Sequence, residues 1–135
     1  MSTYTSTSYH EGGMRYRTEF SQSNVCITTD ISAALGGRGE SPSPAQLLAA
    51  SVASCMGSMM VFLGARRGIN TEGITIESGY EEGKNGITAL NFHITVPQPL
   101  TKEEQTILEA AVKGCPVGAV ITPGVTKNIS WTWAS

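Results

Sequence analysis

One long apolar segment, between Ser43 and Gly68, has the pattern of a single helix. Ser43 followed by Pro44 is typical of a helix N-cap and first helical residue, and Gly68 is typical of a helix end. Larger apolar side chains recur between them at steps of three and four residues: Leu47, Leu48, Val52, Cys55, Met59, Phe62 and Leu63. Because most other positions carry alanine, serine or glycine, we expect this helix to be buried on nearly every face.

Length and composition narrow the kind of molecule this chain can form. Its 135 residues suffice for one domain with its own core and are too few for two ordinary domains, so we expect a single domain over residues 1–135. Charged residues make up only 15 %, so some apolar surface is expected to be buried against another subunit. The net charge is −2 and there is no run of Lys or Arg, which predicts no nucleic-acid binding.

Neither a membrane span nor an export signal is predicted. The first 13 residues, MSTYTSTSYHEGG, have no basic start and no apolar stretch. Polar or small residues interrupt the apolar region 45–64: Gln46, Ser51, Ser54, Gly57 and Ser58. We therefore expect a cytoplasmic protein, whose three cysteines are normally reduced and form at most a transient disulfide.

The remaining segments predict strands and two further helices. Five stretches have the composition of strands, namely 14–20, 24–29, 72–80, 87–96 and 125–133. Thr101 and Glu104 form a capping-box pattern for a helix over about 102–114, and Pro116 is expected to end it at Cys115, where a short new turn begins. The expected order is ββαββααβ. This is an α+β fold in which two antiparallel sheet regions pack around the central helix.

Cys55 and Cys115 decide between two interpretations of the chain. A buried free cysteine is often inert packing, whereas two cysteines that meet form a dithiol able to cycle through a disulfide. The start of a short helix after Cys115 favours its thiolate, while Cys55 lies in mid-helix and needs a cation from elsewhere in the fold. Cys26 lies in a strand, where we expect it to be filling.

Other site chemistries have weak support. There is no Cys-x-x-Cys, and the two histidines, His10 and His93, are isolated, so we expect no metal site. His93 falls in the polar phase of its strand, where we expect a solvated side chain. No G-x-S-x-G occurs, and the loop Gly36-Gly37-Arg38-Gly39 lacks the Lys-Ser/Thr of a phosphate-binding loop. We therefore expect no resident cofactor.

Several motifs together resemble the OsmC/Ohr family. The two cysteine segments, SPSPAQLLAASVASCMGSMM and AVKGCPVGAVI, carry most of the likeness. The shorter stretches HEGGMR, GGRGE, RRGI and WTW resemble an OsmC-like subgroup and follow in the same order. The resemblance extends over nearly the whole chain.

This resemblance implies an intertwined homodimer, with buried central helices and both active sites at the subunit interface. It implies peroxidase activity toward organic hydroperoxides, and in some members toward hydrogen peroxide. Cys55 matches the peroxidatic cysteine, Cys115 the resolving cysteine and Arg15 the catalytic arginine, with Arg38 as the alternative. No bound cofactor is implied, because an external dithiol, a lipoylated protein or a small thiol would reduce the disulfide.

One position departs from the family pattern. Ala45 stands where well-studied members carry a glutamate that helps to hold the arginine, and Glu40 in the preceding loop is a candidate substitute. Apolar side chains such as Met59, Phe62 and Leu63 are expected to line a pocket for an alkyl peroxide. Two other interpretations are a non-catalytic OsmC-like protein, which binds an apolar ligand or serves as a structural dimer, and a thiol redox sensor.

Overall fold

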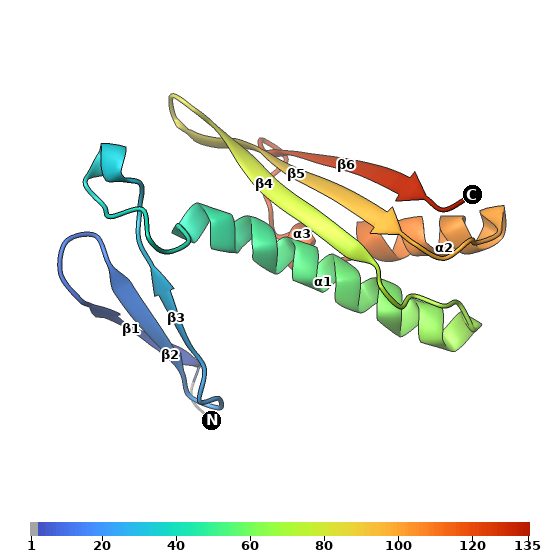
Figure 1. Ribbon diagram of the computed structural model, residues 1–135, viewed down its shortest axis with the longest axis horizontal. Coiled ribbons are helices and arrows are strands. Elements are labelled where there is room, and N and C mark those ends of the chain that lie inside the picture. Colours follow the sequence, from blue (N-terminus) through green and yellow to red (C-terminus); the bar gives the residue numbers. More distant parts are fainter. Residues whose placement is uncertain (1–2) are drawn as a thin grey trace. The chain divides into compact units, whose positions relative to one another are not determined.

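The computed structural model describes residues 3–135 (Figure 1). The chain forms two compact units, Met1–Leu47 and Leu48–Ser135. The mixture of helices with two three-stranded sheets is the predicted α+β class.

The first unit is built on an antiparallel sheet in the order β1-β2-β3. Its strands are β1 Ser6–His10, β2 Tyr16–Phe20 and β3 Cys26–Thr29, and the short 3-10 helix η1, Ala33–Leu35, follows them. β1 was not predicted, so the order is βββαββααβ. All five of its residues are exposed, and it is held by backbone pairing with β2. A strand without a buried face lacks the alternation of apolar and polar residues that signals a strand.

The second unit contains the sheet β4-β5-β6. β4, Thr75–Gly83, and β5, Gly86–Val96, form an antiparallel hairpin, which confirms the predicted turn near Asn85-Gly86. β6, Thr126–Trp133, runs parallel to β5, whereas we expected antiparallel sheets. The reason is the long helical connection between β5 and β6, since only a crossover of this length can bring a strand back in the same direction.

Helix α1 runs from Pro44 to Arg67, with the predicted ends. The N–H of Gln46 donates to Ser43 Oγ at 3.1 Å, and the N–H of Ser43 donates to Gln46 Oε1 at 2.8 Å. This reciprocal pair is a capping box, which satisfies two backbone donors at the start of the helix. After Arg67 the chain turns at Gly68, whose φ of +68° favours glycine.

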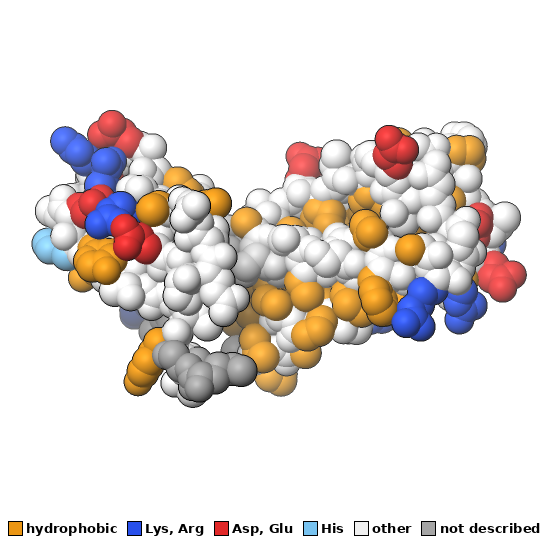
Figure 2. Space-filling view, turned by 90° about the horizontal axis from the view of Figure 1, so that it is seen from below, with side chains coloured by type: hydrophobic (Ala, Val, Ile, Leu, Met, Phe, Trp, Pro, Cys, Tyr) orange, Lys and Arg blue, Asp and Glu red, His pale blue; other side chains and the backbone are white. Residues whose placement is uncertain are grey.

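Only one face of α1 is buried within the chain. Its buried residues are Ala49, Val52, Ala53, Met56, Met60 and Gly64. Val61 and Phe62 are more than half exposed, so the expectation of burial on nearly every face is not met in a single chain. Hydrophobic side chains are grouped on the exposed surface of this unit (Figure 2). α1 is long and apolar enough to cross a membrane: its most apolar 18 residues have a mean hydropathy of 1.8, and 33 % of them are buried. Core helices of soluble proteins have the same length and composition.

Two shorter helices complete the second unit. α2 is Lys102–Lys113, with the predicted capping box between Thr101 and Glu104. α3 is Pro116–Ala119, and Cys115 is its N-cap. Both α1 and α2 lie on one face of the sheet (Figure 1). The buried core therefore joins α1 and α2 to alternate residues of β5, which are Leu90, Phe92, Ile94 and Val96.

Candidate functional site

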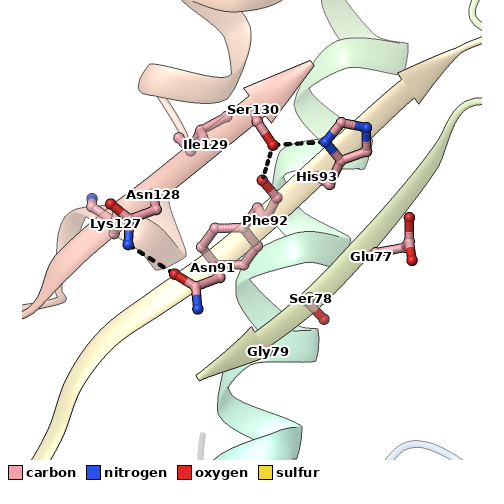
Figure 3. A pocket seen from close by; sticks show the side chains of 10 residues that line it. All are labelled: Glu77, Ser78, Gly79, Asn91, Phe92, His93, Lys127, Asn128, Ile129 and Ser130. Carbon is pink, nitrogen blue, oxygen red and sulfur yellow. Dashed lines mark hydrogen bonds between the residues drawn. The ribbon is translucent and has the colours of Figure 1, made fainter. Parts of the chain in front are cut away.

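A hollow of about 610 Å³ in the second unit lies on the polar face of its sheet (Figure 3). His93 bridges two hydroxyls there, with Nδ1 2.6 Å from Ser130 Oγ and Nε2 2.7 Å from Thr132 Oγ1. His93 lies in the polar phase of β5, as predicted. Because hydroxyls hold both ring nitrogens, no carboxylate among residues 3–135 orients this imidazole as in a serine hydrolase. The hollow contains none of the predicted site residues.

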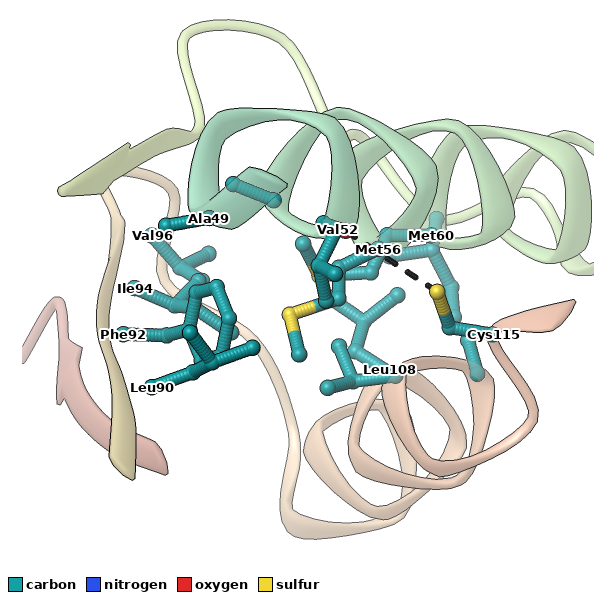
Figure 4. Packing of buried hydrophobic residues seen from close by; sticks show 14 residues of the cluster. Ala49, Val52, Met56, Met60, Leu90, Phe92, Ile94, Val96, Leu108 and Cys115 are labelled. Atoms are coloured by element: carbon teal, nitrogen blue, oxygen red, sulfur yellow. Dashed lines mark hydrogen bonds between the residues drawn. The ribbon is translucent and has the colours of Figure 1, made fainter. Parts of the chain in front are cut away.

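Cys55 and Cys115 meet within the second unit. Cys55 is half-buried in the middle of α1, and Cys115 is 2 % exposed at the start of α3. The Cys115 thiol accepts from the Gly118 N–H at 3.2 Å and lies 3.9 Å from the Val52 carbonyl oxygen (Figure 4). The side chain of Cys55 lies close enough to the same thiol to raise its pKa. Residues 60 positions apart thus form a pair of neighbouring thiols.

The surroundings of Cys115 keep its thiol protonated. Burial raises the pKa of Cys115 above its ordinary value, and the side chain of Cys55 raises it further through a hydrogen bond and like charge. The N–H of Gly118 lowers this pKa but does not outweigh burial. We expected the start of α3 to favour the Cys115 thiolate. The backbone N–H groups of Gly118 and Val117 do lower the pKa of Cys115, but burial and Cys55 outweigh them, so the net shift is upward.

Arg15 lies in the first unit, at the turn between β1 and β2. Its backbone is held by two bonds, from its own N–H to the Gly12 carbonyl at 3.0 Å and from the Glu11 N–H to its carbonyl at 2.9 Å. Its Nη2 lies 3.8 Å from Oδ2 of Asp30, which is 1 % exposed. Arg15 Nε is buried and has no hydrogen-bond partner among residues 3–135. The guanidinium is therefore paired with Asp30 on one side, and its Nε is enclosed without an acceptor among these residues.

Asp30 was not singled out from the sequence. Its Oδ1 accepts from the Ile31 N–H at 2.8 Å and its Oδ2 from the Arg38 N–H at 3.1 Å. The bond from Ile31 lowers the pKa of Asp30 most, the bond from Arg38 and the charge of Arg15 add to it, and burial opposes them. Asp30 is consequently an anion at neutral pH. An isolated Asp after a strand has no distinctive sequence signal, so only the folded loop reveals this contact.

Arg38 and Glu40 form a separate surface pair. Arg38 Nε lies 3.6 Å from Glu40 Oε1, and both side chains are about two-thirds exposed. Ala45 offers no carboxylate, and Gln46 is engaged in the capping box of α1. Among the described residues, the carboxylate paired with Arg15 is thus that of Asp30, not Glu40.

Cys26 does not fill a core, contrary to our expectation. It is exposed at the start of β3, opposite Glu19 of β2, and contacts the side chain of Arg17. None of the four residues of β3 is buried, so this strand offers no core position to fill. Cys26 belongs to the first unit, while Cys55 and Cys115 belong to the second.

Each unit also has a smaller hollow. In the first unit, a hollow of about 320 Å³ is lined by Glu11, Gly12, Gly13, Arg15, Asp30 and Arg38. In the second, an apolar hollow of about 310 Å³ is lined by Leu48, Ile87, Leu90, Val120, Ile121, Thr122 and Val125. The expected lining residues Met59, Phe62 and Leu63 are absent from the second hollow. Within residues 3–135, no three His, Cys, Asp or Glu side chains gather as metal ligands.

Residues 37–130 match the model of the family described as OsmC-like protein. The chain belongs to the OsmC-like family. No curated protein matches the chain. The family membership agrees with the order of the motifs around Cys55 and Cys115.

Solved structures of the OsmC-like family share the fold. One, from Psychrobacter arcticus 273-4, is provisionally described as an osmotic stress induced and detoxification response protein. It is 28 % identical, with 98 % of each chain covered and a TM-score of 0.92. The organic hydroperoxide resistance protein OsmC of Legionella pneumophila is 21 % identical, with 98 % of this chain and 99 % of that chain covered and a TM-score of 0.75. OhrB of Bacillus subtilis, also an organic hydroperoxide resistance protein, is 16 % identical, with coverage of 97 % and 100 % and a TM-score of 0.69. At these identities the last two show the fold alone.

Proposed function

We propose that this protein is a thiol-dependent peroxidase that reduces organic hydroperoxides through Cys55 and Cys115. The observation that carries the proposal is the meeting of the two thiols in one unit. The raised pKa of Cys115 supports the division of roles, because a Cys115 that stays protonated leaves Cys55 to attack first. Membership of a family in which some structural relatives are named organic hydroperoxide resistance proteins adds support.

The proposed reaction has two steps in the protein. The Cys55 thiolate attacks one peroxide oxygen, the O–O bond breaks, and the alkoxide leaves as an alcohol after taking up a proton; Cys55 becomes a sulfenic acid. The Cys115 thiolate then attacks the Cys55 sulfur, forming a disulfide and releasing water. An external dithiol, lipoylated or small, supplies two electrons and two protons to restore both thiols. In this scheme Arg15 stabilises the Cys55 thiolate and orients the peroxide.

An apolar substrate is favoured by the hollow in the second unit. Leu48, Ile87, Leu90 and Val125 line it, together with the segment that follows α3. That segment follows the short helix α3, whose N-cap is Cys115. An alkyl group in such a hollow gains binding free energy that hydrogen peroxide cannot. We therefore propose organic hydroperoxides as the better substrates, in a cytoplasm that keeps the thiols reduced.

Peroxide consumption by single-cysteine variants tests this function. Wild-type protein with dithiothreitol should consume cumene hydroperoxide, and Cys55→Ser should fall to the uncatalysed background because the attacking sulfur is gone. Cys115→Ser should react once and then accumulate over-oxidised Cys55, seen by mass spectrometry. Cys26→Ser is the matched control and should retain wild-type turnover. A wild type without thiol loss, or a Cys55→Ser variant with full activity, would contradict the proposal.

The second candidate function is a non-catalytic protein that binds an apolar ligand. The apolar hollow beside α3 and the alanine at position 45 favour it. In that case fatty acids should bind the wild type and Cys55→Ser equally, and no disulfide should form with peroxide. A redox sensor would form the disulfide but turn over slowly with every dithiol.

A further inference from the structure

We infer that Asp30 is the positioning residue for Arg15: a buried carboxylate, fixed by the loop after β3, that sets the direction of the arginine side chain. The inference rests on the proposed function, in which Arg15 acts on the peroxide and the thiolate. Asp30 itself touches neither and acts through Arg15.

Asp30 is a fixed charge. Its side chain is 1 % exposed, and its two oxygens accept from the backbone N–H groups of Ile31 and Arg38. A bond from the Asp30 N–H to the Pro42 carbonyl, at 3.1 Å, ties the end of β3 to the loop before α1. A carboxylate held by two backbone donors has little freedom to turn. Its place beside Arg15 is therefore set by the backbone and not by a side-chain rotamer.

Gly37 shows how closely the loop surrounds this carboxylate. A Cβ at Gly37 would lie 2.7 Å from Asp30 Oδ1 and 2.0 Å from the Ile31 carbonyl oxygen. Any larger residue at position 37 would therefore displace the carboxylate or the loop. The loop therefore packs closely around the Asp30 carboxylate, whereas the carboxylate of a surface ion pair is surrounded by solvent.

The other arginines of the first unit differ from Arg15. Arg17 bonds directly to both Glu11 and Glu19, and Arg38 pairs with Glu40 at the surface. Arg15 has its carboxylate at 3.8 Å and a buried Nε without a partner among the described residues. The charge of Arg15 is thus held beside Asp30 without a direct hydrogen bond between the two side chains. A directly bonded pair such as Arg17–Glu19 would instead have its donors occupied.

Two variants of nearly opposite character test the inference. Asp30→Asn keeps the size and one acceptor but removes the charge, whereas Asp30→Glu keeps the charge and adds a methylene group. We expect kcat/KM for cumene hydroperoxide to fall about tenfold or more in Asp30→Asn and by less in Asp30→Glu, because the charge is what orients Arg15. Glu19→Gln, which removes the charge from an exposed ion pair of the same sheet, is the matched control and should change kcat/KM less than twofold.

A double-mutant cycle separates positioning from packing. In an Arg15→Met background, Asp30→Asn should lower kcat/KM no further, because its effect passes through Arg15. Additive losses in the cycle, or a variant series in which Asp30→Asn is harmless and Asp30→Glu is harmful, would overturn the inference in favour of a packing role.

A measurement on the unmodified wild type decides the case even if Asp30→Asn does not fold or the wild type consumes no peroxide. The Nε–H signal of Arg15 in a ¹H–¹⁵N spectrum, assigned with Arg15→Lys, should exchange with water more slowly than the signals of the exposed Arg66 and Arg67. An Arg15 signal that exchanges as fast as theirs would show an unrestrained side chain and would overturn the inference independently of the proposed function.

Discussion

At the scale of single residues, the protonation of Cys115 sets the pH dependence expected for disulfide formation. Burial and the neighbouring Cys55 raise the pKa of Cys115, so little of it is thiolate at neutral pH. The attacking species is the thiolate, and its fraction rises about tenfold per pH unit below the pKa. Cys55 lies beside this thiol, and Lys127 donates to the carbonyl of Gly118, whose N–H donates to Cys115 Sγ.

We therefore expect the rate of disulfide formation after a single peroxide pulse to rise steeply from pH 6 to pH 8. Stopped-flow mixing followed by thiol trapping measures this rate, while the first step is followed separately as sulfenic acid formation in Cys115→Ser. A rate of disulfide formation that is flat across this range would show that Cys115 is already ionised and that its surroundings do not control the step.

At the scale of elements, Lys127 of β6 anchors the short helix that carries Cys115. Its Nζ donates to the Gly118 carbonyl at 2.8 Å, and the N–H of Gly118 donates to Cys115 Sγ. Lys127→Met should lower the free energy of unfolding by about 1 kcal/mol, the worth of one partly exposed charged hydrogen bond. It should also slow disulfide formation without slowing the oxidation of Cys55. Urea denaturation and the two single-step assays measure these effects.

Lys84→Met, in the exposed turn between β4 and β5, is the control for that change. It removes the same charge where no hydrogen bond from the side chain is recorded among the described residues, so stability should change by less than about 0.5 kcal/mol. If both variants lose the same stability, the loss reflects net charge and not the anchoring of α3.

The elements that could be predicted from the sequence are those with local signals. The ends of α1 follow from Ser43, Pro44 and Gly68, and α2 follows from its capping box, because caps are formed by neighbouring residues. The buried face of α1 was not predicted: among the recurring apolar side chains singled out from the sequence only Val52 is buried, because the buried face also uses alanine and glycine. β1 lacks a buried face, and the role of Asp30 depends on a loop that closes only in the folded chain.

At the scale of the whole molecule, each unit leaves apolar surface uncovered. In the second unit, Val61 and Phe62 of α1 are 54 % and 55 % exposed. In the first unit, the sheet has no buried apolar residue, although it carries Tyr9, Tyr16 and Phe20. Exposed apolar side chains in such number are more typical of a surface covered by another chain. We propose a second copy of this chain as the cover, as the family resemblance implies.

Sedimentation equilibrium tests this proposal. The wild type should have twice the 14.3 kDa mass of one chain at micromolar concentration. Phe62→Glu should shift the equilibrium toward monomer by at least tenfold in Kd, because a carboxylate would be buried without a partner. Thr106→Glu, on the exposed face of α2, adds the same charge and should leave the dimer intact. If the wild type sediments as a monomer, or if both variants dissociate equally, α1 is not the dimer surface, and the exposed side chains of its outer face need another explanation.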